Sequence, residues 1–214
     1  MMTVKPTGHY LTRPDGLHLA FDRLFHAPIE DVWYSLTNPS AMKAWIGTYT
    51  GRPATGAVRF RMNAEEEYAE DEGWMNVTIL QCDRPHRFVA DSTAPPAHMR
   101  LYCHLTEGGG MTTLTLAQYV MPDTDVASVG PGWDYYLDRL IAARNGAAMP
   151  AWESYFPAFT RYYRELTVPP RASTRTPAEA VLGADGRGEP GHGPEAGYDP
   201  AHDADLNAPA RPPR

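Results

Sequence analysis

One 19-residue stretch most constrains how this chain can fold. In residues 128–146, SVGPGWDYYLDRLIAARNG, apolar side chains recur at helical spacing, at Trp133, Leu137, Leu140 and Ile141. This spacing predicts a helix with one apolar face. Pro131 and its flanking glycines are typical of a helix start, and Asn145-Gly146 is typical of a left-handed stop. Such a helix, about 20 Å long, is able to lie across a whole sheet.

The residues before this helix alternate in the manner of β-strands. The run LHLAFDRLF at residues 17–25 predicts a first strand, and alternation resumes from residue 49 to residue 120. Residues 107–110, Glu-Gly-Gly-Gly, separate two alternating runs and predict a hairpin. Strands joined in this way form an antiparallel sheet with one buried face, and the long helix is the natural cover for that face.

Two proline-containing segments predict short helices between the first strand and the rest of the sheet. Pro28 precedes apolar residues at helical spacing, and Asn38-Pro39 places a capping residue directly before a proline. We therefore expect an α+β fold of the helix-grip (START-like) type. It combines a curved antiparallel sheet wrapped around a long C-terminal helix with two short helices after strand 1.

Composition divides the chain into three parts. Residues 1–16 are polar and punctuated by proline and glycine, and we expect a flexible N-terminal arm. Residues 17–166 form the expected domain, which includes an aromatic-rich helical segment at residues 150–166 that packs back on it. Residues 167–214 are rich in proline, glycine and alanine, so we expect a disordered tail.

Charge and apolar patterning exclude several functional classes. The net charge of −7 leaves no basic stripe for nucleic acid. The longest apolar runs are shorter than a membrane span, and the N-terminus lacks the apolar core of a signal peptide. We expect a cytoplasmic protein.

The sequence predicts no metal site, cofactor or catalytic residue. Cys82 and Cys103 are too few for a disulfide framework or a zinc site, and we expect both to be small buried hydrophobic residues. The acidic run at residues 65–72 lacks the ligand spacing of a calcium loop and is typical of a solvated hairpin tip. The motifs of nucleophilic hydrolases, phosphate-binding loops, dinucleotide-binding folds and zinc proteases are missing.

Four segments carry a resemblance to a known superfamily. They are RLFHAPIEDVWYSLTNPSAMKAWIG, GAVRFRM, GWMNVTILQCDRPHRFVAD and GPGWDYYLDRL. Their order and spacing resemble the SRPBCC (START-like) superfamily, and within it the group named after the C-terminal domain of the heat-shock-protein ATPase activator. The matching positions are Arg23, Ala27-Pro28, Val32-Trp33, Thr37-Asn38-Pro39, Trp45, Gly56 and Gly132-Trp133. The resemblance covers roughly residues 17–166 and implies the fold, but members with this fold differ widely in function.

The resemblance also implies a cavity between the sheet and the long helix, open to a small hydrophobic molecule. Large aromatic and apolar side chains with a few polar groups are typical of such a lining. The candidate ligand-binding residues are Arg23, Trp45, Phe60, Met62, Trp74, Leu101, Tyr102, Trp133, Tyr136 and Leu140. The same residues are equally able to fill a solid core, since periodicity does not distinguish a hollow interior from a filled one.

Arg23 is an anomaly, because it lies on the apolar face of the first strand. Either its long side chain lies near the sheet edge and reaches solvent, or it enters the cavity and holds an anionic group.

Three functions are therefore open. The first is binding of a small hydrophobic or amphipathic ligand. The second is a cyclase- or hydrolase-like enzyme that uses Arg23, Tyr102 or His104. The third is a co-chaperone-like module with a protein partner.

Overall fold

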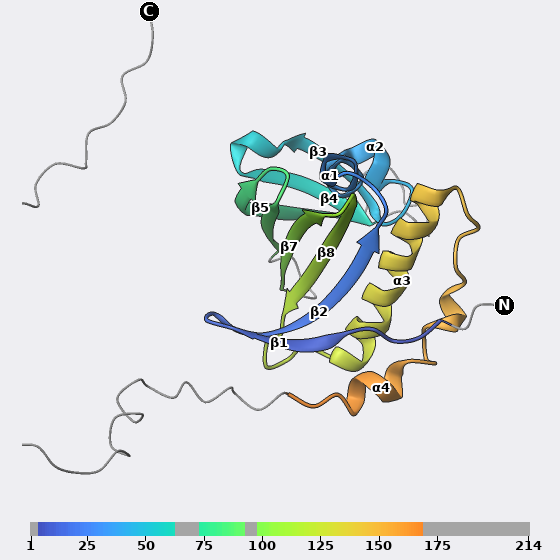
Figure 1. Cartoon of the computed structure of the whole chain (residues 1–214). Helices are drawn as coiled ribbons and strands as arrows, with labels where there is room; N and C mark the ends of the chain where they lie inside the picture. Colours follow the sequence, from blue (N-terminus) through green and yellow to red (C-terminus); the bar gives the residue numbers. More distant parts are fainter. Residues whose placement is uncertain (1–3, 63–72, 93–97, 169–214) are drawn as a thin grey trace, which may run out of the picture. The chain divides into compact units, whose positions relative to one another are not determined.

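A computed structural model describes residues 4–62, 73–92 and 98–168 (Figure 1). These residues fall within one compact unit, Met1–Arg171, and a second unit, Ala172–Arg214, lies outside the described residues. The predicted disordered tail, beyond residue 168, and the predicted acidic hairpin tip at residues 65–72 also lie outside them.

Eight strands form one antiparallel sheet in the order β1-β2-β8-β7-β6-β5-β4-β3. Their bounds are β1 His9–Arg13, β2 Gly16–Phe25, β3 Gly47–Arg52, β4 Ala57–Met62, β5 Trp74–Asp83, β6 Arg87–Ser92, β7 Met99–Gly108 and β8 Met111–Tyr119. The run at residues 17–25, predicted to be the first strand, lies in β2. This strand pairs with β8, the last strand in the sequence. Together with one long helix and several short ones, this sheet confirms the predicted α+β helix-grip fold.

The expectation of a flexible arm over residues 1–16 is wrong for its second half. Residues His9–Arg13 form β1 and pair along their whole length with β2, from His9 opposite Ala20 to Arg13 opposite Gly16. An edge strand needs neither of its faces to be apolar. The sequence of β1 is largely polar, so a search for alternating apolar residues does not predict a strand there. The turn residues Pro14-Asp15-Gly16 were the available signal.

The two short helices begin where the prolines indicated. Helix α1 spans Ile29–Thr37 after Pro28, and α2 spans Pro39–Met42. The Asn38 side chain accepts hydrogen bonds from the backbone N–H groups of Ser40 and Ala41, as a helix-capping residue does. In Figure 1, α1 and α2 lie together at the β3–β4 end of the sheet.

The long helix α3 spans Val126–Asn145 and begins earlier than predicted. The Asp125 side chain caps it by accepting from Ala127 N–H, so Pro131 lies inside the helix and not at its start. The predicted end is confirmed, since Gly146 follows with a left-handed backbone at φ +61°. Figure 1 shows α3 running alongside β2.

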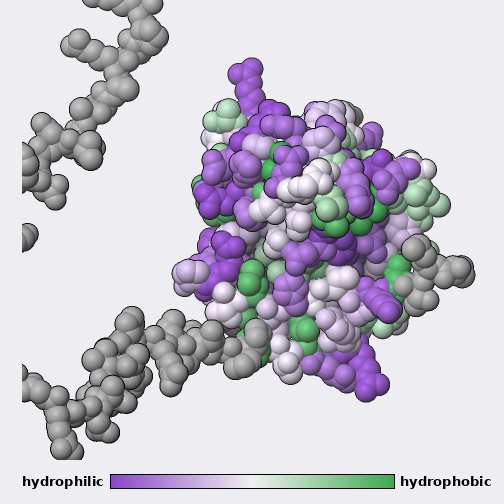
Figure 2. Space-filling model, in the orientation of Figure 1, coloured by the Kyte–Doolittle hydropathy of each residue, from purple (hydrophilic) through white to green (hydrophobic). Residues whose placement is uncertain are grey.

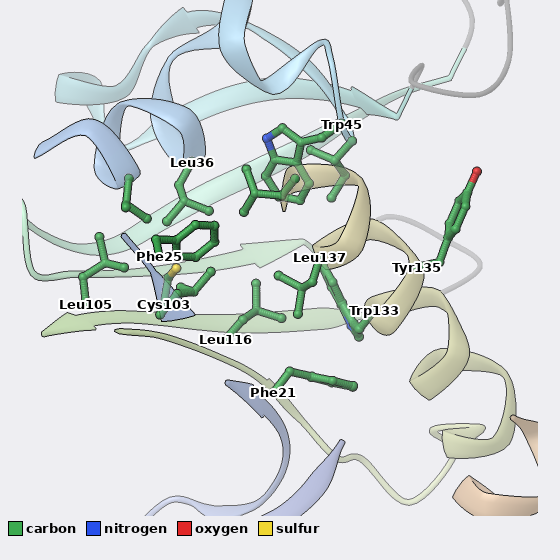
Figure 3. Close-up of a cluster of buried hydrophobic side chains, with 14 of the residues drawn as sticks. Phe21, Phe25, Leu36, Trp45, Cys103, Leu105, Leu116, Trp133, Tyr135 and Leu137 are labelled. Atoms are coloured by element: carbon green, nitrogen blue, oxygen red, sulfur yellow. The ribbon is translucent and has the colours of Figure 1, made fainter. Parts of the chain in front are cut away.

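The core lies where the apolar face of α3 and the α1 helix meet β2, β7 and β8. Figure 3 shows Trp133 and Leu137 projecting from α3 toward the sheet, where Phe21 and Leu116 meet them. Tyr135, also buried, projects from another side of α3 and packs against Trp152 and Tyr155. Apolar burial of this kind stabilises the fold by about 25 cal/mol for each Å² removed from water.

The aromatic-rich segment after α3 returns to the domain, as predicted. It contains a 3-10 turn, η2 Trp152–Ser154, and a short helix, α4 Thr160–Arg164. Tyr155, Phe159 and Tyr163 are buried, whereas Trp152, Phe156 and Tyr162 remain more than one third exposed. On the face drawn in Figure 2, hydrophobic and hydrophilic residues are intermixed. Within the described ranges, no helix has the length and apolar character needed to cross a membrane.

Candidate functional site

A pocket of about 320 Å³ lies between the two short helices and the β3–β6 half of the sheet. Its lining residues are mostly aliphatic or aromatic: Trp33, Leu36, Thr37, Met42, Tyr49, Pro53, Val58, Phe60, Val77, Ile79, Cys82, Arg84, Phe88 and Ala90. This volume lies at the lower end of the range for small-molecule sites, about 300–1,000 Å³. The pocket therefore suits a small apolar body.

Strand register assembles the pocket floor. Val58 of β4 lies opposite Val77 of β5, and Ile79 lies opposite Ala90 of β6. The register then shifts between Ile79 and Gln81, so that Cys82 lies opposite Phe88. One extra residue in a strand moves every later side chain to the other face. This bulge therefore places Cys82 in the pocket lining, where it is exposed, so the prediction of a buried Cys82 is wrong.

The two cysteines differ in reactivity as a result. Cys82 is exposed, whereas Cys103 is buried in the core. Burial in apolar surroundings raises the pKa of the Cys103 thiol far above its ordinary value. Cys82 is consequently the cysteine that reagents and ligands reach.

The pocket walls offer few free polar groups. Trp33 and Leu36 of α1 are buried, and Trp33 meets the Phe88 ring edge-on at a centroid distance of 5.8 Å. The Tyr49 hydroxyl donates a hydrogen bond to the Thr37 carbonyl oxygen at 2.9 Å, and burial raises the Tyr49 pKa. Tyr49 is therefore a neutral group whose proton already has an acceptor.

The pocket includes only Phe60 of the ten predicted ligand-binding residues, and the others lie elsewhere. Trp45, Trp133 and Leu140 are buried members of the core beneath α3. Met62, Leu101 and Tyr136 are partly buried and pack against that core. These six side chains therefore belong to the core or pack against it, and the pocket described above lies to one side of them, at α1 and α2.

Trp74 and Tyr102 lie away from both the core and the pocket lining. The Trp74 ring lies near the guanidinium of Arg61, at 4.7 Å. Tyr102 projects from the opposite face of β7 to Leu101, and its hydroxyl donates to the Asp15 carboxylate. Leu101 and Tyr102 are neighbours on β7, so their side chains point to opposite faces of the sheet. The two residues therefore cannot line the same cavity, contrary to the prediction.

Arg23 fits neither of its two expected roles. Its side chain is only 7% exposed, and its Nη2 atom lies 3.1 Å from both Asp134 Oδ1 and Asp138 Oδ1 on α3. Its Nη1 atom donates to the Thr7 hydroxyl at 2.7 Å. The anionic groups that Arg23 holds are thus side chains of this chain.

This ion-pair cluster also fastens both ends of the domain to α3. Asp134 is fully buried and accepts hydrogen bonds from Thr7 and from the Tyr163 hydroxyl. Asp138 accepts from the Tyr155 hydroxyl at 2.7 Å. The available signal was the i, i+4 spacing of two aspartates on one helix, matched to a lone arginine on a strand face. The role of this ion-pair cluster is structural.

The described residues contain no group of three or more histidine, cysteine or acidic side chains placed to hold a metal ion. The residues of the enzyme hypothesis are also separated. Arg23 lies on the core-facing side of β2, whereas Tyr102 and His104 lie on the outward side of β7.

Comparison with known proteins assigns the chain to a family. The sequence model described as activator of Hsp90 ATPase homolog 1-like protein matches residues 26–144, more than half of the chain. The chain belongs to this family. No curated protein matches it.

Solved structures of similar fold agree with this assignment. CalU16 from Micromonospora echinospora is 20% identical with a TM-score of 0.60, and the match covers 77% of this chain and 98% of CalU16. The BPP1335 protein from Bordetella parapertussis is 22% identical with a TM-score of 0.57, covering 79% and 97%. DynU16, from the dynemicin biosynthetic locus, is 19% identical with a TM-score of 0.52, covering 63% and 49%. At this identity the likeness shows the fold alone.

The part that matches the activator of Hsp90 ATPase homolog 1-like family contains the whole pocket. Every lining residue falls between Trp33 and Ala90. Strands β1 and β2 and the segment from η2 to α4 lie outside the match. The pocket therefore belongs to the family region. Arg23, Thr7, Tyr155 and Tyr163, which donate to the Asp134 and Asp138 carboxylates or to one another, lie beyond it.

His18, also outside the family match, is an unusual buried group on the outward side of β2. Its side chain is 0% exposed, and among the described residues neither ring nitrogen has a hydrogen-bond partner. The Tyr102 and Tyr119 rings pack against it, and the Asp15 carboxylate lies 3.6 Å from Nε2. Burial lowers the His18 pKa below 6.5. The Asp15 charge and the nearby backbone of Gly16 and Leu11 oppose this shift, and the Arg13 charge adds to it.

We expect His18 to make the folded state less stable as pH falls below about 6.5. There the unfolded chain binds a proton that folded His18 resists, so the free energy of unfolding falls by at most about 1.4 kcal/mol per pH unit. Urea unfolding of wild type and His18→Leu between about pH 5.5 and 7.5 tests this. The profile of the His18→Leu variant should be flatter. The exposed control His104→Gln should follow wild type, and parallel profiles for all three would contradict the assignment.

Proposed function

We propose that this protein binds a small, largely apolar molecule in the pocket between α1, α2 and strands β3–β6. The observation that carries the proposal is the pocket itself, about 320 Å³ in volume and lined almost entirely by apolar side chains. Burial of apolar ligand surface there supplies the affinity, and pockets of this composition are typical small-molecule sites.

The buried surroundings of the pocket support a site that exists before the ligand arrives. Trp33 and Leu36 are held on α1, whose end Asn38 links to a capped α2. The Tyr49–Thr37 hydrogen bond ties β3 to α1 across one side of the pocket. Because these walls are fixed by the fold, a ligand need not order them on binding, which favours affinity.

A pocket-filling substitution tests this function. Ala90→Phe adds a ring inside the pocket, whereas Leu80→Phe adds a ring on the exposed bulge beside it. We expect Ala90→Phe to weaken binding of a neutral probe, 1-naphthaleneacetamide, by tenfold or more, on the order of 1.4 kcal/mol. Leu80→Phe should leave the affinity unchanged. Isothermal titration calorimetry measures both, and circular dichroism confirms that each variant is folded.

Alkylation of Cys82 by iodoacetamide gives an independent readout of the same site. Bound probe should slow the reaction of Cys82, while buried Cys103 stays unreactive and serves as an internal control. Native mass spectrometry of the purified protein then shows whether an apolar molecule accompanies it. Equal affinity of wild type and a folded Ala90→Phe protein would overturn the proposal. So would failure of both neutral and charged naphthalene probes to bind a protein that carries no other ligand, and a surface role with a protein partner would then be favoured.

A further inference from the structure

The pocket has one charged group in its lining. Among the described residues around it, Arg84 is the only one that carries a charge, and the other polar groups are Thr37, Tyr49 and the Cys82 thiol. Arg84 lies in the turn between β5 and β6, and its side chain is 69% exposed. The cation thus stands where the apolar pocket opens to water.

Arg84 forms an exposed ion pair with Glu30, and a ligand carboxylate is able to replace Glu30 in this pair. Its Nη2 and Nε atoms lie 3.0 and 3.3 Å from the same oxygen, Oε2 of Glu30. The Glu30 side chain is 54% exposed and is not part of the pocket lining. Exposed ion pairs contribute little to stability, and this one does not use the two-oxygen geometry that makes arginine–carboxylate pairs strong. A ligand carboxylate therefore competes with Glu30 on similar terms.

The rest of the pocket determines where a ligand's polar end must lie. A charged group buried among the apolar floor residues would lose its hydration without gaining a partner. The Tyr49 hydroxyl already donates its proton to Thr37. Among the described lining residues, Arg84 at the mouth is the one group that offers a charge together with access to water, and its charge favours an anion.

We propose that the ligand is an amphipathic acid, with its apolar body in the pocket and its carboxylate on Arg84 in place of Glu30. This inference rests on the proposed function and adds the chemical class of the ligand. The protein's net charge of −7 repels anions at long range, so a preference for acids has to come from this local contact.

Three probes with one apolar body test the proposal: 1-naphthaleneacetate, 1-naphthaleneacetamide and 2-(1-naphthyl)ethylamine. We expect wild type to bind the acid about fivefold more tightly than the amide, and the amine most weakly. Arg84→Gln should reduce the affinity for the acid to that for the amide. Glu30→Gln should raise it, because the competing carboxylate is gone. A salt concentration of about 0.5 M should diminish the preference for the acid.

Arg87→Gln is the matched control, because Arg87 is a nearby exposed arginine paired with Asp83 that does not line the pocket. It removes the same charge from the same turn region and should leave the ratio of acid to amide affinity unchanged. Equal binding of acid and amide by wild type, or no effect of Arg84→Gln on that ratio, would overturn the inference while the proposed function stands. Failure of all three probes to bind would instead remove the proposed function.

Discussion

Replacement of Arg23 by leucine should lower the free energy of unfolding by about 3–5 kcal/mol, because it leaves a buried charge without its partner. The side chain is 7% exposed and lies 3.1 Å from carboxylate oxygens of Asp134 and Asp138. Without it, the fully buried Asp134 carboxylate loses its cationic partner. Urea unfolding followed by circular dichroism measures the loss.

Two further variants separate the lost ion pair from lost packing. Arg23→Leu with Asp134→Leu removes the fully buried carboxylate together with its cation, so part of the stability should return. The return is partial because Asp138 loses its cation and the Thr7 and Tyr163 hydroxyls lose their acceptor. Arg161→Gln breaks an ion pair with Glu165 whose arginine is 86% exposed, and it should change stability by less than about 1 kcal/mol. The assignment fails if Arg23→Leu costs no more than Arg161→Gln. Because a loss of this size can unfold a marginally stable domain, the double variant also gives a measurable folded protein.

Gly130→Ala should destabilise the protein by about 1–3 kcal/mol, although alanine favours helices over glycine. A Cβ atom on Gly130 would overlap the Tyr163 ring. That ring is 1% exposed and is fixed by hydrogen bonds of its hydroxyl group with Asp134 and with Gly8 N–H. The ring therefore has no room to move away, and α3 and α4 must separate.

Gly132→Ala provides the opposite expectation in the same helix. Within the described part of the chain, a Cβ atom there would meet nothing within 4 Å, and its backbone is helical. We expect a gain of about 0.5–1 kcal/mol, because alanine loses less conformational freedom on folding. Thermal and urea unfolding of the two variants should shift in opposite directions. Shifts of the same sign would show that Tyr163 does not constrain Gly130.

Local patterns predicted most of the secondary structure correctly. The apolar spacing of Trp133, Leu137 and Leu140 identified the face of α3 that packs on the sheet. The glycines after Glu107 identified the β7–β8 hairpin, in which Gly108 lies opposite Met111. These features were readable because helix and hairpin geometry depends on residues a few positions apart.

The candidate site was predicted less well, because it depends on which side chains meet across the chain. Phe60 was predicted correctly as a lining residue. Trp133 and Leu140 are also large and apolar, but they lie in the core. Size and hydrophobicity are alike for a core residue and a pocket residue, and only packing separates them. Trp33 and Phe88 were missed for the same reason.

Local sequence patterns were sufficient to predict the long helix, the short capped helices and the antiparallel hairpins. Three features were visible only in the folded chain: residues His9–Arg13 complete the sheet, Arg23 pairs with α3, and a register shift next to Ile79 places Cys82 in the pocket. The difference follows from the range of the interactions. Periodicity, capping and turn preferences act between neighbours in sequence, whereas strand register, buried ion pairs and an unfilled space depend on contacts between residues that are distant in sequence.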